Sequence, residues 1–272
     1  MNAIVRETVC PLLAEPSWES TLVDEVLYGM VVELLESPAP GWYRVRTHYR
    51  YEGIAPASAL LAEPAQVSAW QDLPKRVVLE KNFCDVLNRP KVQGWRMETL
   101  PRGGVIAVEG EPENGWQKVR LVDGRTGFSQ ASLLSPFYDA PCCAEETSLR
   151  KALVRCAMLY AGTHYRWGGK SPMGIDCSGL VSMAYMLCGI CIYRDASIVD
   201  GFPIHAISRE HMQPGDLLFF PGHVAMYLGE GRYCHSTGRA GDDGFAVNSL
   251  YPGDPDYRAD LAGKITAIGS YF

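Results

Sequence analysis

The chain has 272 residues, of which 47% are hydrophobic and 21% are charged, and its formal net charge is −6. This length suits about two domains of roughly 150 residues each, or three smaller ones. An acidic chain without a basic patch is a poor partner for nucleic acid or for an anionic membrane surface, so we expect neither as a partner. No stretch approaches the roughly 20 apolar residues of a transmembrane helix, and no membrane span is predicted.

The N-terminal segment Met1–Ser20 contains Glu7, Pro11 and Pro16 and has no continuous apolar core. It therefore lacks the pattern of a secretory signal. The nine cysteines are an odd number, which favours reduced thiols over a framework of disulfides. Both features predict a cytoplasmic protein, and secretion is the alternative if a leader has been removed.

The first half of the chain contains an internal repeat. Gly41–Arg46 recurs as Gly115–Arg120, at an offset of 74 residues (115 − 41). A constant offset between similar segments indicates two copies of one structural unit. Each copy consists of short β-rich runs separated by Gly, Pro and Asn, which predicts two small β-barrels. We place the barrels at residues 1–66 and 75–137, with Pro64–Pro74 as a connector.

An amphipathic helix is predicted at residues 145–161. Its apolar face combines residues at helical spacing, namely Leu149, Ala152, Leu153, Cys156 and Leu159. Thr147 or Ser148 is expected to cap the N-terminus, because a hydroxyl can accept a hydrogen bond from an unpaired backbone N–H. The segment His164–Gly169 that follows is too rich in glycine and aromatic residues to continue this helix.

A second predicted helix carries a cysteine in its first turn. The segment Leu180–Leu187 is apolar and Gly189 follows it, which predicts a buried helix that ends there. Cys177 lies just before this segment, where unpaired N–H groups and the helix dipole favour the thiolate over the thiol. Cys177 is therefore the candidate nucleophile.

A histidine follows at the start of a predicted strand. Two strands joined by a Pro-Gly turn are expected at 216–220 and 223–228, so that His223 opens the second strand. A short turn then leads to a third strand that contains His235. A three-residue loop pairs Ala225 with His235 and places the two histidines on one face as diagonal neighbours. A two-residue loop places them on opposite faces.

Five motifs match one family in their order and spacing, and they span roughly residues 145–272: Tyr165–Gly169, Asp176–Leu180, Pro214–Leu217, Gly222–Tyr227 and His235–Ser236. Together they resemble the NlpC-type cysteine peptidases, a papain-like group that acts on bacterial cell-wall peptides. The two copies of the repeat are similar to bacterial SH3-like domains. The resemblance implies an α+β chain, with a papain-like peptidase domain at 145–272 preceded by two small SH3-like β-barrels.

The resemblance also implies roles for four residues. Cys177 would be the nucleophile, His223 the general base and His235 the residue that orients the base. Tyr165 would help to position the reacting carbonyl. Family members cleave the bond between γ-linked D-glutamate and a diamino acid in peptidoglycan stem peptides. The expected reaction passes through a thioester on Cys177 and requires no metal, no other cofactor and no obligatory protein partner.

Two SH3-like modules ahead of such a domain resemble the family members that trim peptides already released from the cell wall. In those members the first module restricts the site to a stem peptide with a free N-terminal L-alanine. Matched by position, the substrate amine would meet Glu25, Tyr51, Asp176, Ser178 and Asp195. Carboxylates and a phenol provide acceptors for an ammonium group. Asp24 is an equal candidate to Glu25.

The leading hypothesis is a cytoplasmic γ-D-glutamyl-L-diamino acid endopeptidase that recycles free murein peptides. Three alternatives stay open: a secreted autolysin that acts on intact peptidoglycan stems, a non-catalytic peptide-binding relative, and an acyl transferase that uses the same thioester. The sequence does not determine whether the third substrate residue is diaminopimelate or lysine.

Overall fold

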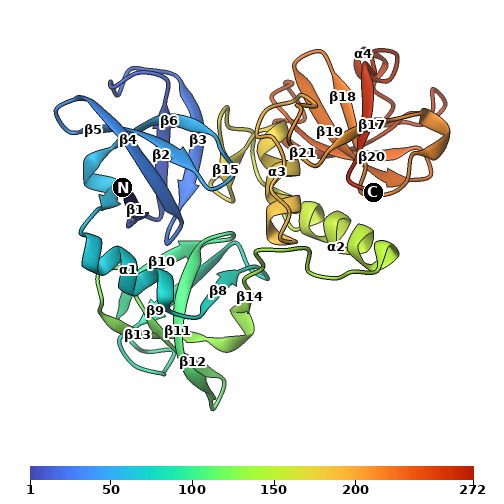
Figure 1. Cartoon of the computed structure of the whole chain (residues 1–272). Helices are drawn as coiled ribbons and strands as arrows, with labels where there is room; N and C mark the ends of the chain where they lie inside the picture. The colour runs from blue at the N-terminus through green and yellow to red at the C-terminus, as the bar shows by residue number, and fades with distance from the viewer. The chain divides into compact units, whose positions relative to one another are not determined.

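The computed structural model describes residues 1–272, which divide into two compact units, Met1–Phe137 and Tyr138–Phe272. The first unit is built from two antiparallel sheets of seven strands each. The second unit combines a six-stranded sheet and a two-stranded sheet with helices (Figure 1). No helix combines the length and the apolar character needed to cross a membrane.

The two sheets of the first unit have the same topology. The first has the order β3-β2-β6-β5-β4-β1-β7, and the second has the order β10-β9-β13-β12-β11-β8-β14, in which each strand number is higher by seven. This equivalence confirms the repeat that the sequence predicted.

The strands of the first sheet are β1 (Asn2–Val5), β2 (Val9–Leu13), β3 (Leu22–Leu27), β4 (Val31–Ala39), β5 (Trp42–Thr47), β6 (Glu52–Pro56) and β7 (Leu60–Leu61). Those of the second are β8 (Lys75–Val78), β9 (Phe83–Leu87), β10 (Arg96–Pro101), β11 (Val105–Glu113), β12 (Trp116–Arg120), β13 (Thr126–Gln130) and β14 (Leu134–Pro136), and the 3-10 helices η1 (Ala57–Ala59) and η2 (Ala131–Leu133) precede the last strand of each sheet.

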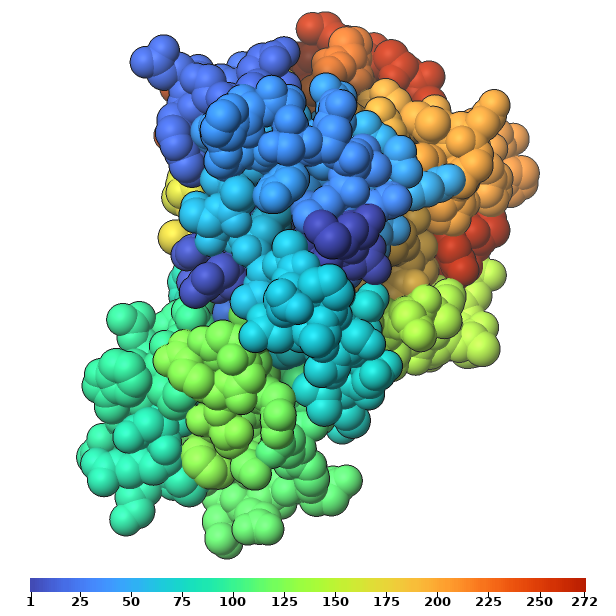
Figure 2. All heavy atoms as spheres, turned by 60° about the vertical axis from the view of Figure 1, so that its left-hand side comes forward, coloured from blue at the N-terminus to red at the C-terminus, as the bar shows by residue number.

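The segment predicted as a connector is a helix, α1 (Pro64–Asp72), that contributes to the core of the first unit. Pro64 lies at the helix start, where a missing N–H costs nothing. Val67 and Trp70 are spaced to share one face, and both are buried. The indole of Trp70 donates a hydrogen bond of 3.1 Å to the Gly29 carbonyl. Figure 2 shows α1, in cyan, beside the dark blue N-terminal residues that it packs against.

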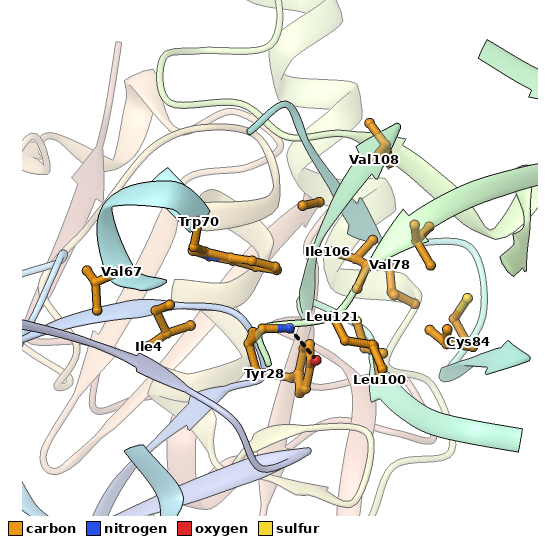
Figure 3. Packing of buried hydrophobic residues seen from close by; sticks show 14 residues of the cluster. Ile4, Tyr28, Val67, Trp70, Val78, Cys84, Leu100, Ile106, Val108 and Leu121 are labelled. Atoms are coloured by element: carbon orange, nitrogen blue, oxygen red, sulfur yellow. Dashed lines mark hydrogen bonds between the residues drawn. The ribbon is translucent and has the colours of Figure 1, made fainter. Parts of the chain in front are cut away.

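One apolar cluster joins residues from both copies of the repeat. Figure 3 shows Ile4, Tyr28 and Trp70 facing Ile106 and other residues of the second copy. The hydroxyl of Tyr28 accepts a hydrogen bond of 3.0 Å from the Val122 N–H. The two copies therefore share a core, which explains why they form one compact unit.

The second unit places two helices against a sheet (Figure 1). The sheet has the order β17-β22-β18-β19-β20-β21. The helices are α2 (Glu146–Met158), α3 (Cys177–Leu187), α4 (Ala259–Ala262) and the 3-10 helix η3 (Arg209–His211), and the strands are β15 (Lys170–Ser171), β16 (Gly174–Ile175), β17 (His205–Ile207), β18 (Leu217–Phe220), β19 (His223–Gly229), β20 (Arg232–Thr237), β21 (Gly244–Ser249) and β22 (Ala267–Ser270).

The first helix of this unit differs from its prediction at both ends. It ends at Met158 rather than at residue 161, and its cap is Glu145 rather than Thr147 or Ser148. The Glu145 carboxylate accepts hydrogen bonds of 2.8 and 2.7 Å from the N–H groups of Thr147 and Ser148. A carboxylate also interacts favourably with the positive end of the helix dipole, which the two hydroxyl side chains cannot do.

Candidate active site

The start of α3 holds Cys177 in a defined position. Asp176 is the N-cap, and its carboxylate accepts a hydrogen bond of 2.5 Å from the Gly179 N–H. Cys177 is the first helical residue, as predicted, and it is 7% exposed. A side chain at position 179 would collide with the Gly169 carbonyl oxygen. The glycine after Cys177-Ser178 thus lets the first turn of the helix pack directly on the segment before it.

The side chains on either side of Cys177 are held by a buried arginine. Arg194 donates to both carboxylate oxygens of Asp176, at 3.1 Å each, and to the Ser178 hydroxyl at 2.7 Å. Asp176 also accepts from the Gly168 N–H at 2.9 Å. Asp176 and Ser178, which were predicted to meet a substrate amine, thus belong to a buried network of hydrogen bonds. The geometry therefore favours a role for Asp176 and Ser178 in fixing the Cys177 turn.

The strand register brings the two predicted histidines together. Met226 pairs with Cys234 and Tyr227 with Tyr233, which is the register expected for a three-residue loop. The register shifts next to the turn, where Gly229 pairs with Arg232. The Nε2 atom of His223 lies 2.7 Å from the Nδ1 atom of His235. The alternative register, with the histidines on opposite faces, is thereby excluded.

A third polar side chain continues this chain of hydrogen bonds. The Nε2 atom of His235 lies 2.8 Å from the Oδ1 atom of Asn248. Asn248 belongs to β21, pairs with Tyr233 of β20 and is 7% exposed. The sequence analysis missed Asn248. The available signal was a lone amide in the otherwise strand-like run Val247–Leu250, but its partner could not be identified without the register.

Cys177 lies next to the histidine strand. Helix α3 packs on β19, and the backbone N–H of Val224, the residue after His223, hydrogen-bonds the Cys177 sulfur. Burial and the Asp176 carboxylate raise the pKa of the Cys177 thiol from 9.0 to about 11, although the N–H groups of Val224 and Ser178 lower it in part. The N–H groups at the helix start act in the predicted direction, but burial has the larger effect on the pKa of this thiol.

Both histidines are neutral in the folded protein near neutral pH. Burial, the neighbouring His235 and the Arg258 guanidinium lower the pKa of His223 from 6.5 to about 3. Burial lowers the pKa of His235 to about 4, although its hydrogen bond to Asn248 acts in the opposite direction. The resting site therefore combines a thiol with a neutral imidazole that can accept its proton.

We expect acid to destabilise the protein through these two histidines. Their folded pKa values lie below the ordinary value of 6.5, so the unfolded chain binds more protons below that pH. The contribution of the two neutral imidazoles to the free energy of unfolding is fully present above pH 6.5. It is lost as the pH falls towards about 4, by about 1 kcal/mol per pH unit for each imidazole. Thermal unfolding at about pH 7.5 and about pH 5 measures this loss. The variant His235→Gln should lose less stability, while the exposed control His205→Gln should behave as wild type; equal losses in all three proteins would contradict the assignment.

Tyr165 lies close to the same cysteine. It forms a bridge with Ile175, two residues before Cys177. Burial and the nearby Cys177 and Asp176 raise the pKa of the Tyr165 phenol to about 12. The phenol therefore keeps its proton near neutral pH and can donate a hydrogen bond beside the sulfur.

A small pocket opens beside the cysteine helix. Its lining includes Val181, one turn after Cys177, and Val224, whose N–H bonds the sulfur, together with Phe202 and Phe219. The exposed Asp195 also lines it. Asp195, one of the residues assigned to the substrate amine, therefore lies at this small pocket.

The other two residues assigned to the amine lie in the first unit. Glu25 is in β3, and Tyr51 lies in the turn between β5 and β6, where its N–H is bonded to the Thr47 hydroxyl at 3.0 Å. The neighbouring Asp24 accepts a hydrogen bond of 2.5 Å from the buried Tyr49 hydroxyl. Asp24 and Glu25 are both buried, and both stay candidates for the amine.

Comparison with known sequences finds relatives of the whole chain and of its second unit. A model described as the NlpC/P60 family matches residues 162–252. A dipeptidyl-peptidase 6 from Lysinibacillus sphaericus is 46% identical over 275 residues, which cover 100% of this chain and 100% of that protein. A gamma-D-glutamyl-L-lysine dipeptidyl-peptidase from Bacillus cereus is 38% identical over 92 residues, 31% of this chain and only 27% of its own length.

A solved structure shares the fold of the entire chain. It is an NlpC/P60 family protein from Bacillus cereus, with a TM-score of 0.81 over 100% of this chain and 99% of its own, at 20% identity. The predicted α+β fold, a papain-like domain preceded by two SH3-like barrels, is confirmed by this match and by the family model.

Proposed function

The chain belongs to the NlpC/P60 family of cysteine peptidases, and within this family of cell-wall peptide hydrolases we propose a specific activity for it. The enzyme cleaves the γ-D-glutamyl–diamino acid bond of free peptidoglycan peptides whose N-terminal L-alanine is unblocked. The observation that carries the proposal is the full-length identity of 46% with a dipeptidyl-peptidase, which includes both barrels. Release of an N-terminal dipeptide requires a free N-terminus.

In the proposed reaction, the Cys177 sulfur attacks the γ-carbonyl carbon while His223 takes the thiol proton. The carbonyl oxygen becomes an oxyanion, which can accept a hydrogen bond from the Cys177 N–H at the start of α3 and from Tyr165. His223 then passes its proton to the leaving amine of the diamino acid, and a thioester on Cys177 remains. Water hydrolyses the thioester and releases the L-Ala-γ-D-Glu dipeptide. The neutral thiol and neutral imidazole of the resting site suit this general-base route.

Asp195 supports the choice of a peptide with a free amine. Its exposed carboxylate can bind an ammonium group. We assign the amine to Asp195, and Glu25 and Tyr51 stay predictions from the resemblance. A peptide whose amine is acylated carries no positive charge and would not be attracted to the Asp195 carboxylate.

Cleavage of two matched peptides tests the proposal. We expect wild type to release dipeptide from L-Ala-γ-D-Glu-diamino acid at least about 100-fold faster than from the same peptide with an N-acetylmuramoyl-blocked amine. The variant Asp195→Asn should lose about 10- to 100-fold in kcat/KM on the free peptide, because its neutral amide opposes no charge. The exposed control Asp200→Asn should retain wild-type kinetics.

The other outcomes of this test distinguish the alternatives. Equal or faster cleavage of the blocked peptide would indicate an autolysin, and binding without cleavage would indicate a non-catalytic relative. A dipeptide recovered on an added amine rather than as the free acid would indicate a transferase. Peptides with diaminopimelate or lysine in the third position determine which diamino acid is preferred. The cytoplasmic location stays a prediction, which fractionation of the native cells would test.

A further inference from the structure

We propose that Asn248 is a positioning residue of this peptidase, which sets the tautomers of both histidines and so presents the Nδ1 lone pair of His223 as the base. The inference rests on the roles proposed for Cys177 and His223. It adds a fourth member to the predicted set of Cys177, His223 and His235. Three distances along one path of hydrogen bonds carry the inference, together with the burial of the residues in that path.

The orientation of the Asn248 amide is determined by the Asp256 carbonyl. A backbone carbonyl oxygen can only accept a hydrogen bond, and it lies 2.8 Å from the Nδ2 atom of Asn248. The Nδ2 amino group must therefore face Asp256, and the Oδ1 atom must face His235, at 2.8 Å from its Nε2 atom. Because an amide oxygen only accepts, the proton of this bond belongs to His235 Nε2.

The same reasoning determines the tautomer of His223. A neutral imidazole carries one N–H, so His235 with its proton on Nε2 presents a lone pair at Nδ1. The Nε2 atom of His223, at 2.7 Å from this Nδ1, must then be the donor. A neutral His223 with its proton on Nε2 has its lone pair at Nδ1, the only nitrogen left to receive the thiol proton.

Among the groups around the two histidines, Asn248 is the one that fixes their tautomers. His235 is fully buried and Asn248 nearly so, so water does not compete freely for the His235 N–H. The charged groups that face the histidines are Arg258, Asp242 and Asp260. Arg258 forms ion pairs with both carboxylates, at 2.9 Å to Asp242 and 2.6 Å to Asp260. These groups act on the histidines through their charge, whereas Asn248 is hydrogen-bonded to the ring.

Loss of the amide oxygen would permit the opposite arrangement. His235 could then carry its proton on Nδ1 and donate it to His223 Nε2, which would force the His223 proton onto Nδ1. His223 Nδ1 would then already carry a proton and could not accept the proton of the Cys177 thiol. A wrong tautomer of this kind lowers the rate of the chemical step while substrate binding is little affected.

Two substitutions separate this role from a merely structural one. Asn248→Leu removes the acceptor, and we expect kcat/KM to fall about 10- to 100-fold, mainly through kcat. Asn248→Asp keeps an acceptor for His235 Nε2, so it should recover most of the activity. Its carboxylate also stabilises the imidazolium form, so the acid limb of kcat/KM should move to higher pH. The control is Ser249→Ala, because Ser249 holds the same loop through a 2.5 Å bond to Asp254 and is not bonded to either histidine.

The tautomers themselves provide a readout that does not depend on substrate. In protein labelled with ¹⁵N-histidine, we expect NMR to detect N–H at Nε2 of both His223 and His235 in wild type and Asn248→Asp, and a substantial Nδ1–H population in Asn248→Leu. Wild-type tautomers and wild-type kcat in Asn248→Leu would overturn the proposal, as would an equal loss of activity in Ser249→Ala. If no peptide is cleaved by wild type, the proposed function fails, and the NMR result still decides the role of Asn248.

Discussion

Replacing Cys177 by alanine should reduce dipeptide release by at least roughly 10⁴-fold, because no other group can form the thioester. Alanine removes only the sulfur at a position that is 7% exposed, and the Asp176 cap and Arg194 remain. The folded structure should therefore persist, and substrate binding should change much less than kcat. Single-turnover release of dipeptide measures the effect, and calorimetric titration of the free peptide measures the binding.

The matched control for this prediction is Cys143→Ala. Cys143 is partly exposed, precedes α2 and belongs to no strand of the sheet that carries the histidines. Its replacement should leave the rate within about twofold of wild type, as expected for a residue outside the reaction. Substantial turnover by Cys177→Ala would contradict the proposed mechanism. An equal loss of activity in Cys143→Ala would show that the number of thiols, and not one nucleophile, governs activity.

Replacing Trp70 by alanine should lower the free energy of unfolding of the first unit by about 3–5 kcal/mol. Trp70 lies in the shared apolar cluster (Figure 3). It is 3% exposed and donates a hydrogen bond to the Gly29 carbonyl. The substitution leaves a cavity and an unpaired carbonyl at once, and both destabilise the fold. All tryptophans except Trp167 belong to Met1–Phe137, so tryptophan fluorescence during urea unfolding reports mainly on this unit.

The control for Trp70 is another tryptophan of the same unit. Trp95 is 64% exposed, and Trp95→Ala should change the free energy of unfolding by less than about 0.5 kcal/mol. Both variants lose one fluorophore, so the comparison separates the loss of signal from the loss of packing. If the two variants unfold at the same urea concentration, the helix α1 does not contribute to the core as described.

The helix α1 also illustrates where sequence reasoning failed. Pro64 and Pro74 bracket a short segment between two β-rich copies, a pattern typical of a connector. The segment is helical because Val67 and Trp70 find apolar partners on β1 and on strands of the second copy. Those partners are distant in sequence, and the local pattern of a short helix does not reveal them.

The neighbours of Cys177 illustrate a contact that the sequence could not reveal. Asp176 and Ser178 were predicted to meet a substrate, because a carboxylate beside a nucleophile is a plausible acceptor. Arg194 occupies both in the structure. Arg194 was visible in the sequence next to Asp195, but nothing local indicated that its guanidinium reaches back to the start of α3. The exposed Asp195 next to it lines the small pocket beside α3.

The sequence by itself determined the repeat, the helix that begins at Cys177 and the strands that carry His223 and His235. These features depend on residue spacing, on turn residues and on the two-residue period of strands, all of which are local. Only the tertiary structure decided that the thiol and both imidazoles are neutral, that Arg194 holds Asp176, and that Asn248 completes the path of hydrogen bonds. Protonation depends on burial, and each of these contacts joins residues of different elements, so neither could be obtained from the order of residues alone.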